Sequence, residues 1–445
     1  MFSSKALRPA VMAISLIAMA CAGVSALPAV EASARVMRNK ARESQDRDAP
    51  APAAPAISDD MKAAADGINA FAVNFYRQIR TDKGNLFVSP YSIVTALAMT
   101  SAGARGDTKS EMEKALCFSL PEDRQHKVFG AMIARYNSEA GADGKKRGYE
   151  LSVANRLFGQ QGYKFVPEFL ALNRDLYGAP LQEVDFARAA EAARQTINGW
   201  IEEKTRQKIK DMIPPGMISP LTRLVLVNAI YFKGLWAKQF RKGDTRDMPF
   251  AVGGNGGEGG KVDVPMMNKT FDMIGYFESP GRLQAIDLDY VGGEVSMTVL
   301  LPAEGYGLEG LEKDLTVENL KAWIGGMARR EVVVYLPKFR IKWGTKDIAP
   351  QMRDLGMVKA LGGGGDFSGI SPERGFFISS ILHKAFVDVN EEGAEAAAAT
   401  VVVMQGCAEP PPPAIFRADR PFMFLIREKA SGAILFMGRV TDPRG

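Results

Sequence analysis

Apolar residues in the first half of the chain recur at the spacing of one face of a helix. The longest series runs from residue 68 to residue 79, and shorter series occupy residues 93–98 and 197–201. Because about 3.6 residues make one helical turn, side chains at this spacing share a face that can be buried. We therefore expect the first half of the chain to be rich in helices.

The pattern changes near residue 221, where β-branched and aromatic residues begin to form short continuous runs. The runs cover residues 224–232, 295–301, 332–339, 376–389, 422–427 and 433–440. Runs of this length and composition are typical of strands. Helices that precede strands in this way predict an α+β fold.

The N-terminus has the layout of a secretory signal. Lys5 and Arg8 precede an apolar run over residues 10–22, and small residues follow at 24–26 and again at 32–34. The run is shorter than the roughly 20 residues that a membrane-spanning helix needs. We expect a signal peptide at residues 1–26, with 34 as the latest end, and a secreted protein in the periplasm or outside the cell.

A lipid anchor is the lesser alternative for the same segment. Residues 17–21 faintly resemble a lipoprotein cleavage box that ends at Cys21, but Ala18 stands where a larger aliphatic residue is usual. After this segment, residues 27–58 are mostly Ala, Pro and charged residues. Such a composition cannot bury enough apolar surface to fold, so we expect a disordered linker. Residues 59–443 then form a single domain.

Composition excludes several classes of function. The 445 residues are 46% hydrophobic, which is ordinary for a globular protein, and 56 basic against 51 acidic residues leave a net charge of only +5. Without a long basic run, nucleic acid is not an expected partner. Three cysteines without a C-x-x-C pair and only two histidines, His126 and His383, exclude zinc sites built on histidine pairs. We expect no metal and no small-molecule cofactor.

Motif searches give little support for catalysis. Residues 254–259 match G-x-G-x-x-G by letter, but no helix signal follows them, so we interpret the match as a hairpin or loop. The G-x-S-x-G, H-E-x-x-H and P-loop motifs are absent. The basic residues 145–147 could bind a polyanion, the alternative being a solvated loop.

Three local features are more informative. Residues 85–93 lead a short apolar strand into a helix, with Pro90 near the first helical position and Ser89 as N-cap. Residues 391–400 follow a strand and then contain no large side chain. Four consecutive prolines at residues 410–413 cannot donate to a sheet. A long and unusual loop therefore connects two strands.

The loop has the alternation of a strand. If residues 394–404 joined a sheet, the even-numbered side chains would form a charge-free face and Glu395 would lie on the opposite face. The small residues at its start could enter between existing strands without steric clash. The segment therefore reads as a strand that can be added to a sheet.

A set of motifs in a fixed order gives the chain a family resemblance. The motifs occupy residues 85–93, 226–236, 336–339, 383–387, 393–400 and 416–422. With them the chain resembles the serpins, a family of serine protease inhibitors, over essentially all of residues 59–443, and we expect a secreted member of bacterial type. The resemblance implies three β-sheets, eight or nine helices and an exposed reactive-centre loop.

The resemblance also implies a mechanism. A target serine protease attacks the loop and becomes covalently attached to it, and the cut loop then enters the central sheet as a new strand. The inhibitor is not an enzyme, since the protease supplies the chemistry. We expect a monomer that forms a covalent complex with one protease.

Three groups of residues match functional positions of the family. The hinge, where insertion begins, comprises Gly393, Ala394, Glu395, Ala396, Ala397, Ala398, Ala399 and Thr400. The shutter, a polar cluster beneath the central sheet, comprises Ser89, Ser92, Asn228 and His383. The breach, where the loop first enters, comprises Trp236, Lys338 and Glu391.

Family spacing from Glu391 places the scissile bond between Cys407 and Ala408, with Met404, Gln405 or Gly406 as alternatives for the residue before the cut. A small uncharged residue there favours elastase-, subtilisin- or chymotrypsin-like targets. Papain-like cysteine proteases are an alternative target class. A non-inhibitory carrier or chaperone, and a hydrolase that uses His383, are the alternative functions.

Overall fold

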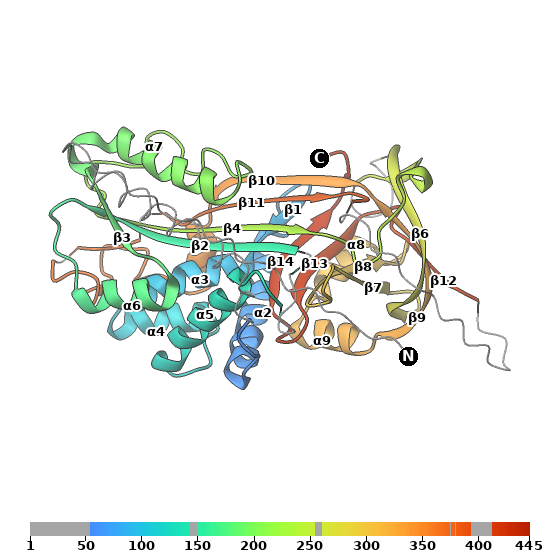
Figure 1. Ribbon diagram of the computed structural model, residues 1–445, viewed down its shortest axis with the longest axis horizontal. Helices are drawn as coiled ribbons and strands as arrows, with labels where there is room; N and C mark the ends of the chain where they lie inside the picture. Colours follow the sequence, from blue (N-terminus) through green and yellow to red (C-terminus); the bar gives the residue numbers. More distant parts are fainter. Residues whose placement is uncertain are drawn as a thin grey trace, which may run out of the picture. The chain divides into compact units, whose positions relative to one another are not determined.

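The computed structural model describes residues 54–141, 147, 149–253, 260–373, 375–378, 380–392 and 412–445 (Figure 1). The predicted signal peptide and most of the predicted linker lie outside these residues. Within them, nine α-helices and three hydrogen-bonded sheets are present. These numbers confirm the α+β class and the fold that the resemblance implies. No helix in the described ranges is both long and apolar enough to cross a membrane.

Most helices precede the strand-rich half, as the sequence predicts. The helices before residue 221 are α2 (Asp59–Ile79), α3 (Pro90–Ser101), α4 (Gly106–Ala115), α5 (Glu122–Asn137), α6 (Pro167–Tyr177) and α7 (Phe186–Lys204). Three shorter helices follow within the strand-rich half: α8 (Gly307–Lys313), α9 (Val317–Gly325) and α10 (Ala349–Asp354). Helix α3 begins as expected, because Pro90 occupies its first turn and the Ser89 hydroxyl accepts a hydrogen bond from the Ser92 backbone N–H at 3.1 Å.

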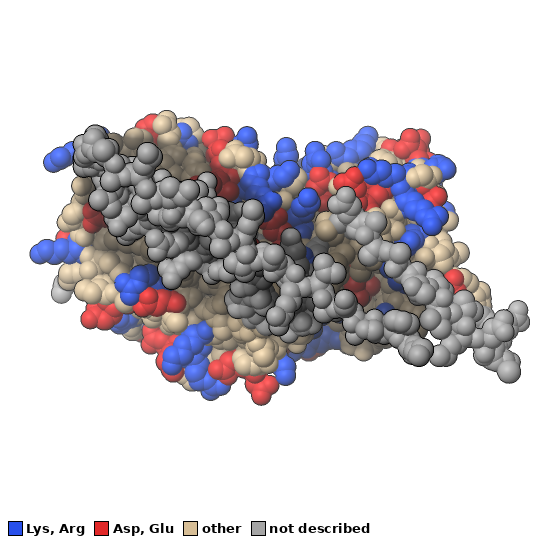
Figure 2. All heavy atoms as spheres, viewed as in Figure 1, with Lys and Arg blue, Asp and Glu red and all other residues tan. Residues whose placement is uncertain are grey.

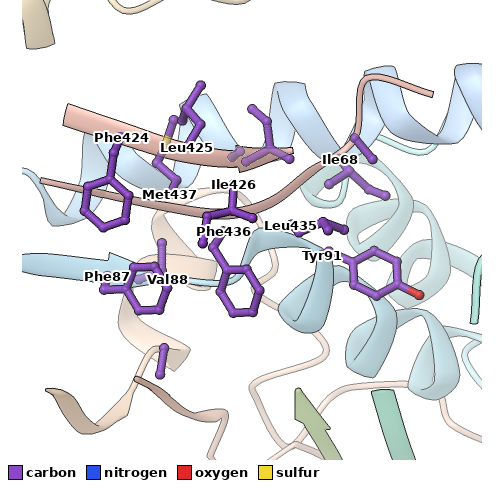
Figure 3. Packing of buried hydrophobic residues seen from close by; sticks show 14 of the residues in the cluster. Ile68, Phe87, Val88, Tyr91, Phe424, Leu425, Ile426, Leu435, Phe436 and Met437 are labelled. Carbon is purple, nitrogen blue, oxygen red and sulfur yellow. The ribbon is translucent and has the colours of Figure 1, made fainter. Parts of the chain in front are cut away.

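The largest sheet has nine strands in the order β1-β14-β13-β8-β7-β6-β9-β12, with β5 paired to β6. The strands are β1 (Leu86–Val88), β5 (Arg246–Ala251), β6 (Lys261–Ser279), β7 (Leu283–Asp289), β8 (Val295–Pro302), β9 (Ala328–Pro337), β12 (Ala414–Arg417), β13 (Phe422–Glu428) and β14 (Ile434–Val440). Strands β8, β13 and β14 are buried at every position. Figure 3 shows part of this core, where Phe87 stacks on Phe424 and Phe436.

Five further strands form two smaller sheets. One contains β3 (Leu181–Val184), β2 (Tyr149–Gln160) and β4 (Leu224–Gly234), and the other pairs β10 (Phe339–Asp347) with β11 (Leu382–Val389). Strands β4 and β11 lie side by side (Figure 1). Among the described residues, however, β4 pairs only with β2 and β11 only with β10. We call the boundary between β4 and β11 the seam.

Helices cover both faces of the strands beside the seam. On one face Phe158 and Val227 pack against α7 in a separate hydrophobic cluster. On the other face Leu157 and Ile230 belong to the main core, which also contains Leu97 of α3. This two-sided burial follows from the alternation of side chains along a strand.

The structure corrects several strand boundaries. The run at residues 332–339 divides at Lys338 between β9 and β10, and the run at residues 376–389 becomes a strand only from Leu382. Strands β2 and β3 were not expected in the helix-rich half. Residues 254–259 lie outside the described residues, but Ala251 and Lys261 on either side pair within the β5–β6 hairpin. The prediction that no helix follows the glycines is confirmed.

The end of the predicted linker packs on the folded body. Ala54 is buried, and the carbonyl of Pro55 accepts a hydrogen bond from Nη1 of Arg135 at 2.8 Å. Helix α2 begins at Asp59, where the sequence places the domain start, and the Ser58 hydroxyl caps it. The last residues of the predicted linker therefore contact the folded body.

Charged side chains of both signs lie beside each other on the face shown in Figure 2. Many form exposed pairs, such as Lys313 with Glu309 in α8, whose side chains are 64% and 56% exposed. A different kind of pair lies inside the molecule, where Arg439 donates to Glu312 at 2.8 Å and the Tyr76 hydroxyl donates to the same carboxylate at 2.7 Å. This buried network joins α2, α8 and β14.

Helix α8 therefore offers a matched test of buried and exposed charge. We expect Glu312→Gln to lower the free energy of unfolding by about 3 kcal/mol, because it leaves the buried Arg439 guanidinium without a counter-charge. Glu309→Gln, on the exposed side of the same helix, should cost less than about 0.5 kcal/mol. Urea denaturation followed by circular dichroism measures both variants. Equal losses would show that Arg439 does not depend on the Glu312 charge.

Candidate functional site

The four predicted shutter residues meet beneath the seam. Ser89 and Ser92 occupy the start of α3, Asn228 belongs to β4, and His383 belongs to β11. The backbone N–H of Ser89 donates to Nε2 of His383 at 3.0 Å, and the Ser92 hydroxyl donates to Oδ1 of Asn228. The first turn of α3 thus holds two strands that have no hydrogen-bonded pairing with each other.

The hydrogen-bond network extends to residues that the sequence analysis missed. The Ser89 hydroxyl donates to the carbonyl of Leu435 at 2.7 Å. Nδ2 of Asn228 donates to Oδ1 of Asn155 in β2 at 2.6 Å, and Nδ2 of Asn155 donates to the carbonyl of Tyr177 at 2.9 Å. Asn155 could have been noticed in the sequence, because it interrupts the apolar alternation of residues 151–157.

His383 is neutral at physiological pH. The side chain is buried, and this burial lowers its pKa to about 4 because the imidazolium loses its hydration. Since Nε2 accepts the Ser89 N–H, the proton of the neutral ring is on Nδ1. The ring is bonded to the backbone N–H of Ser89 and not to its hydroxyl, because the Ser89 hydroxyl donates to the carbonyl of Leu435. The arrangement does not support the alternative of a hydrolase that uses His383.

The other histidine lies in a separate place. His126 of α5 is buried, and its Nδ1 lies 2.6 Å from the Tyr177 hydroxyl. Burial lowers the pKa of His126 to about 4 as well. Within the described ranges, no group of three or more His, Cys, Asp or Glu side chains is arranged to hold a metal ion.

The three predicted breach residues also come together, at the end of β11. Trp236 stacks on Tyr290 with ring centroids 4.7 Å apart and donates from Nε1 to the carbonyl of Asn390 at 2.9 Å. Nζ of Lys338 forms an ion pair with Glu391 at 2.9 Å, and the Thr245 hydroxyl donates to the same carboxylate at 2.8 Å. These contacts fix the point at which the chain leaves β11.

The Glu391 carboxylate is held in its ionised form. Burial by itself favours the neutral acid, but hydrogen bonds from Lys338, the backbone and Thr245 outweigh it and lower the pKa of Glu391 below its ordinary value. The side chain is only 6% exposed. The ion pair between Lys338 and Glu391 is therefore present at neutral pH.

The predicted hinge and reactive bond lie outside the described residues. The described chain stops at Glu392 and resumes at Pro412, so Gly393–Thr400 together with Cys407 and Ala408 fall in between. On resuming, the chain enters β12, which pairs in parallel with β9 in the nine-stranded sheet. The predicted loop therefore leaves one sheet and returns to another.

Two further sequence interpretations change. Arg147 was interpreted as part of a polyanion site or a solvated loop, but its side chain is buried, pairs with Glu294 at 2.8 Å and donates to the carbonyl of Arg135 at 2.6 Å. Cys117 stands in the apolar stretch of residues 115–118, a pattern that favours burial, but the structure buries its side chain only partly. Burial raises the pKa of its thiol, and Nδ2 of Asn74 lies 3.7 Å from the sulfur.

Sequence comparison finds relatives that match along nearly their whole length. The leukocyte elastase inhibitor of Bos taurus is 42% identical over 381 residues, which cover 84% of this chain and 97% of the relative. Human Serpin B3 is 38% identical over 403 residues, which cover 86% of this chain and all of the relative. Human Serpin B8 is 40% identical over 378 residues, with coverages of 84% and 97%.

These relatives contradict the predicted localisation. Leukocyte elastase inhibitor and the B-type serpins are intracellular serpins of clade B, which points away from secretion. The prediction of a secreted or periplasmic protein, with lipid attachment at Cys21 as its alternative, is therefore wrong. The relatives come from animals, so the interpretation of the chain as a secreted member of bacterial type is not supported either.

Solved structures and a family model agree on the fold. Human thyroxine-binding globulin in complex with thyroxine superposes with a TM-score of 0.73 at 31% identity, covering 86% of this chain and all of that one. Uncleaved ovalbumin gives a TM-score of 0.74 at 30% identity, with coverages of 85% and 99%. The model of the serpins, described as serine protease inhibitors, matches residues 66–443. This chain therefore belongs to the serpin family.

Proposed function

We propose that this serpin inhibits serine endopeptidases by suicide trapping, with loop insertion at the seam. The observation that carries the proposal is that β4 and β11 lie side by side while each is hydrogen-bonded along only one edge within the described residues. A strand placed between them would pair on both of its edges. The chain that leaves β11 provides such a strand, since the even-numbered residues from 394 to 404 form a charge-free face.

The reaction starts on the protease. Its serine attacks the carbonyl of Cys407, the peptide bond to Ala408 breaks, and an acyl-enzyme forms on Cys407. Ala408 takes up the proton and becomes the new amino terminus of a C-terminal part that stays in the fold through β12, β13 and β14. The N-terminal part of the cut loop then enters the seam and carries the protease with it. The contacts of Glu391 and Asn390 keep the start of this segment at the breach. Inhibition requires that insertion be faster than hydrolysis of the acyl-enzyme.

Elastase-like enzymes are the proposed first targets. Cys407 is small and uncharged, which suits the shallow specificity pockets of such proteases. Several relatives of high identity are named leukocyte elastase inhibitors. Subtilisin- and chymotrypsin-like proteases accept related residues, and papain-like proteases are the alternative class. One molecule of inhibitor captures one protease.

A non-inhibitory role is the competing function. One solved structure of similar fold is a thyroxine-binding globulin in complex with its hormone, so the fold by itself does not require inhibition. The small residues from Ala394 to Ala399 favour insertion over such a role, because bulky or charged side chains there would resist entry into a sheet.

The hinge provides the first test of the proposed function. Incubation with pancreatic elastase should give a covalent complex of summed mass that survives denaturing electrophoresis. We expect Thr400→Arg to convert the protein largely into a cleaved substrate, because insertion would force an unpaired charge beneath the sheet. A rise of about 3 kcal/mol in the activation free energy of insertion slows this step by about a hundredfold.

Ala397→Arg is the matched control, since its side chain is predicted to face solvent after insertion. It should retain most of the complex formation of the unmodified protein. The measurement is the stoichiometry of inhibition, with cleaved and complexed species separated on the gel. Equal behaviour of the two variants would show that the face assignment is wrong, and full trapping by both would exclude insertion as a strand.

The proposed scissile bond is tested by changing the residue before it. We expect Cys407→Arg to lose inhibition of elastase and to gain inhibition of trypsin, whose specificity pocket carries an aspartate. Cys407→Ala should remain active on elastase, and Cys117→Ala should alter neither activity. Mass spectrometry of the C-terminal fragment, separated by denaturation after the reaction, locates the cut. If Cys407→Arg leaves the choice of protease unchanged, the bond lies after Met404, Gln405 or Gly406.

The two buried histidines, His383 of the shutter and His126 of α5, should make the stability of the protein depend on pH. Each histidine has a folded pKa of about 4 against about 6.5 when unfolded, so the folded state binds fewer protons between these values. Stability is therefore complete above about pH 6.5 and falls towards pH 4, by about 3 kcal/mol for each histidine. Urea denaturation across this range should show that His383→Gln and His126→Gln each remove about half of the dependence. A flat profile in the unmodified protein would contradict burial of both rings.

A further inference from the structure

A cavity lies at the end of the seam that is remote from the breach. Its volume is about 170 Å³, and its walls come from α3, β4 and β11 together with the segments before the two strands. The apolar part of the lining includes Ile93, Leu97, Leu226 and Ile378. Core packing normally leaves few voids larger than a water molecule. A space of this size beside two strands that do not pair with each other among the described residues is therefore a specific feature of the seam.

The cavity has one polar end. Ser92, Asn228 and His383 contribute to its lining. The serine and asparagine bond to each other, and Nε2 of His383 is occupied by the Ser89 N–H. The proton on Nδ1 makes no hydrogen bond to any residue that the structure describes, so His383 can donate one hydrogen bond to a further group.

The lining carries no formal charge, since it contains no Asp, Glu, Lys or Arg. The imidazole of His383 is also neutral, because its burial disfavours the charged ring. An ion placed here would lose its hydration without gaining a counter-charge. The chemistry of the cavity therefore selects an uncharged occupant.

Two large apolar side chains that line the cavity also reach the protein surface. Met217 and Phe377 both line the cavity and are 39% and 47% exposed. Met217 lies in the segment before β4 and Phe377 in the segment before β11, and the Ser380 hydroxyl donates to the sulfur of Met217 at 3.6 Å. Exposed groups of this size, gathered at an opening, are typical of binding sites.

We propose that the seam cavity binds a small uncharged aromatic molecule that carries one hydrogen-bond acceptor. An apolar cavity of about 150 Å³ accommodates benzene, so this one has room for a single ring with a small substituent. The ring contacts the Ile93 and Leu226 walls, and the acceptor takes the free proton of His383.

Occupancy of the cavity has a consequence for inhibition, and this part rests on the proposed function. The bound molecule contacts β4 and β11 at once and fills space that an inserted strand must cross. Insertion is then slower, while attack by the protease on the distant loop is unchanged. The protein in complex with the ligand therefore behaves as a substrate that is cut and released.

Acetophenone is a suitable probe, since it is neutral and has one ring and one carbonyl acceptor. Titration calorimetry on the full chain should show one saturable site. Cumene has nearly the same shape without the acceptor and should bind about five- to tenfold more weakly, the value of one hydrogen bond. Equal affinity of the two molecules would overturn the role of His383.

Ala96→Leu in α3 fills the cavity and should abolish binding, with Thr100→Leu one turn later as a second variant if the first does not fold. Ala134→Leu, at an exposed position of α5, is the matched control and should bind as the unmodified protein does. Binding that persists in a folded cavity-filling variant would overturn the location.

The functional arm measures the stoichiometry of inhibition of elastase with and without saturating acetophenone. We expect acetophenone to raise the stoichiometry of inhibition at least threefold in the unmodified protein and to leave it unchanged in Ala96→Leu. Saturable binding with an unchanged stoichiometry would overturn the regulatory step. Absence of any binding would overturn the site itself, while complex formation without acetophenone still tests the proposed function independently.

Discussion

The structure depends on how α3 holds the seam closed. Among the residues that the structure describes, strands β4 and β11 are neighbours without a hydrogen-bonded ladder between them, and edges of this kind readily accept another strand. The first turn of α3 bridges them through Ser89 to His383 and through Ser92 to Asn228. These few buried hydrogen bonds replace a ladder of many, so they can hold the strands in register and still be exchanged when a new strand arrives.

The breach and the cavity follow from the same constraint. At one end of the seam, Trp236 and the ion pair between Lys338 and Glu391 fix the residues that directly follow β11, so that the next segment of the chain starts from a defined position. At the other end, residues of both strands line a cavity of about 170 Å³. A sheet completed by a further strand would have neither unpaired edges nor this space. Within the described residues the seam thus has unpaired strand edges, whereas strands β8, β13 and β14 of the nine-stranded sheet are buried at every position.

Buried charge contributes to the rigid part. Glu312 receives hydrogen bonds from Tyr76 and Arg439, and Arg147 pairs with Glu294 near the start of β2. Each network joins elements that are distant in the chain, and each is costly to break because a buried ion would lose its partner. The molecule therefore combines buried charge networks that are costly to break with a seam whose two strands do not pair with each other among the described residues.

The sequence by itself determined the local features and the family. Helix spacing, the Ser89 cap, the apolar runs of β4, β8, β13 and β14, and the motifs that identify a serpin all depend on residues that are close in the chain. Only the tertiary structure decided that β4 and β11 do not pair with each other among the described residues, that Asn155 extends the shutter, and that Arg147 is buried with Glu294. Strand alternation reports which face of a strand is buried, but it does not report which edge is paired. Likewise, the letters of a basic run do not reveal a carboxylate that lies more than a hundred residues away. These properties arise from the packing of remote segments against one another, and that packing exists only in the folded chain.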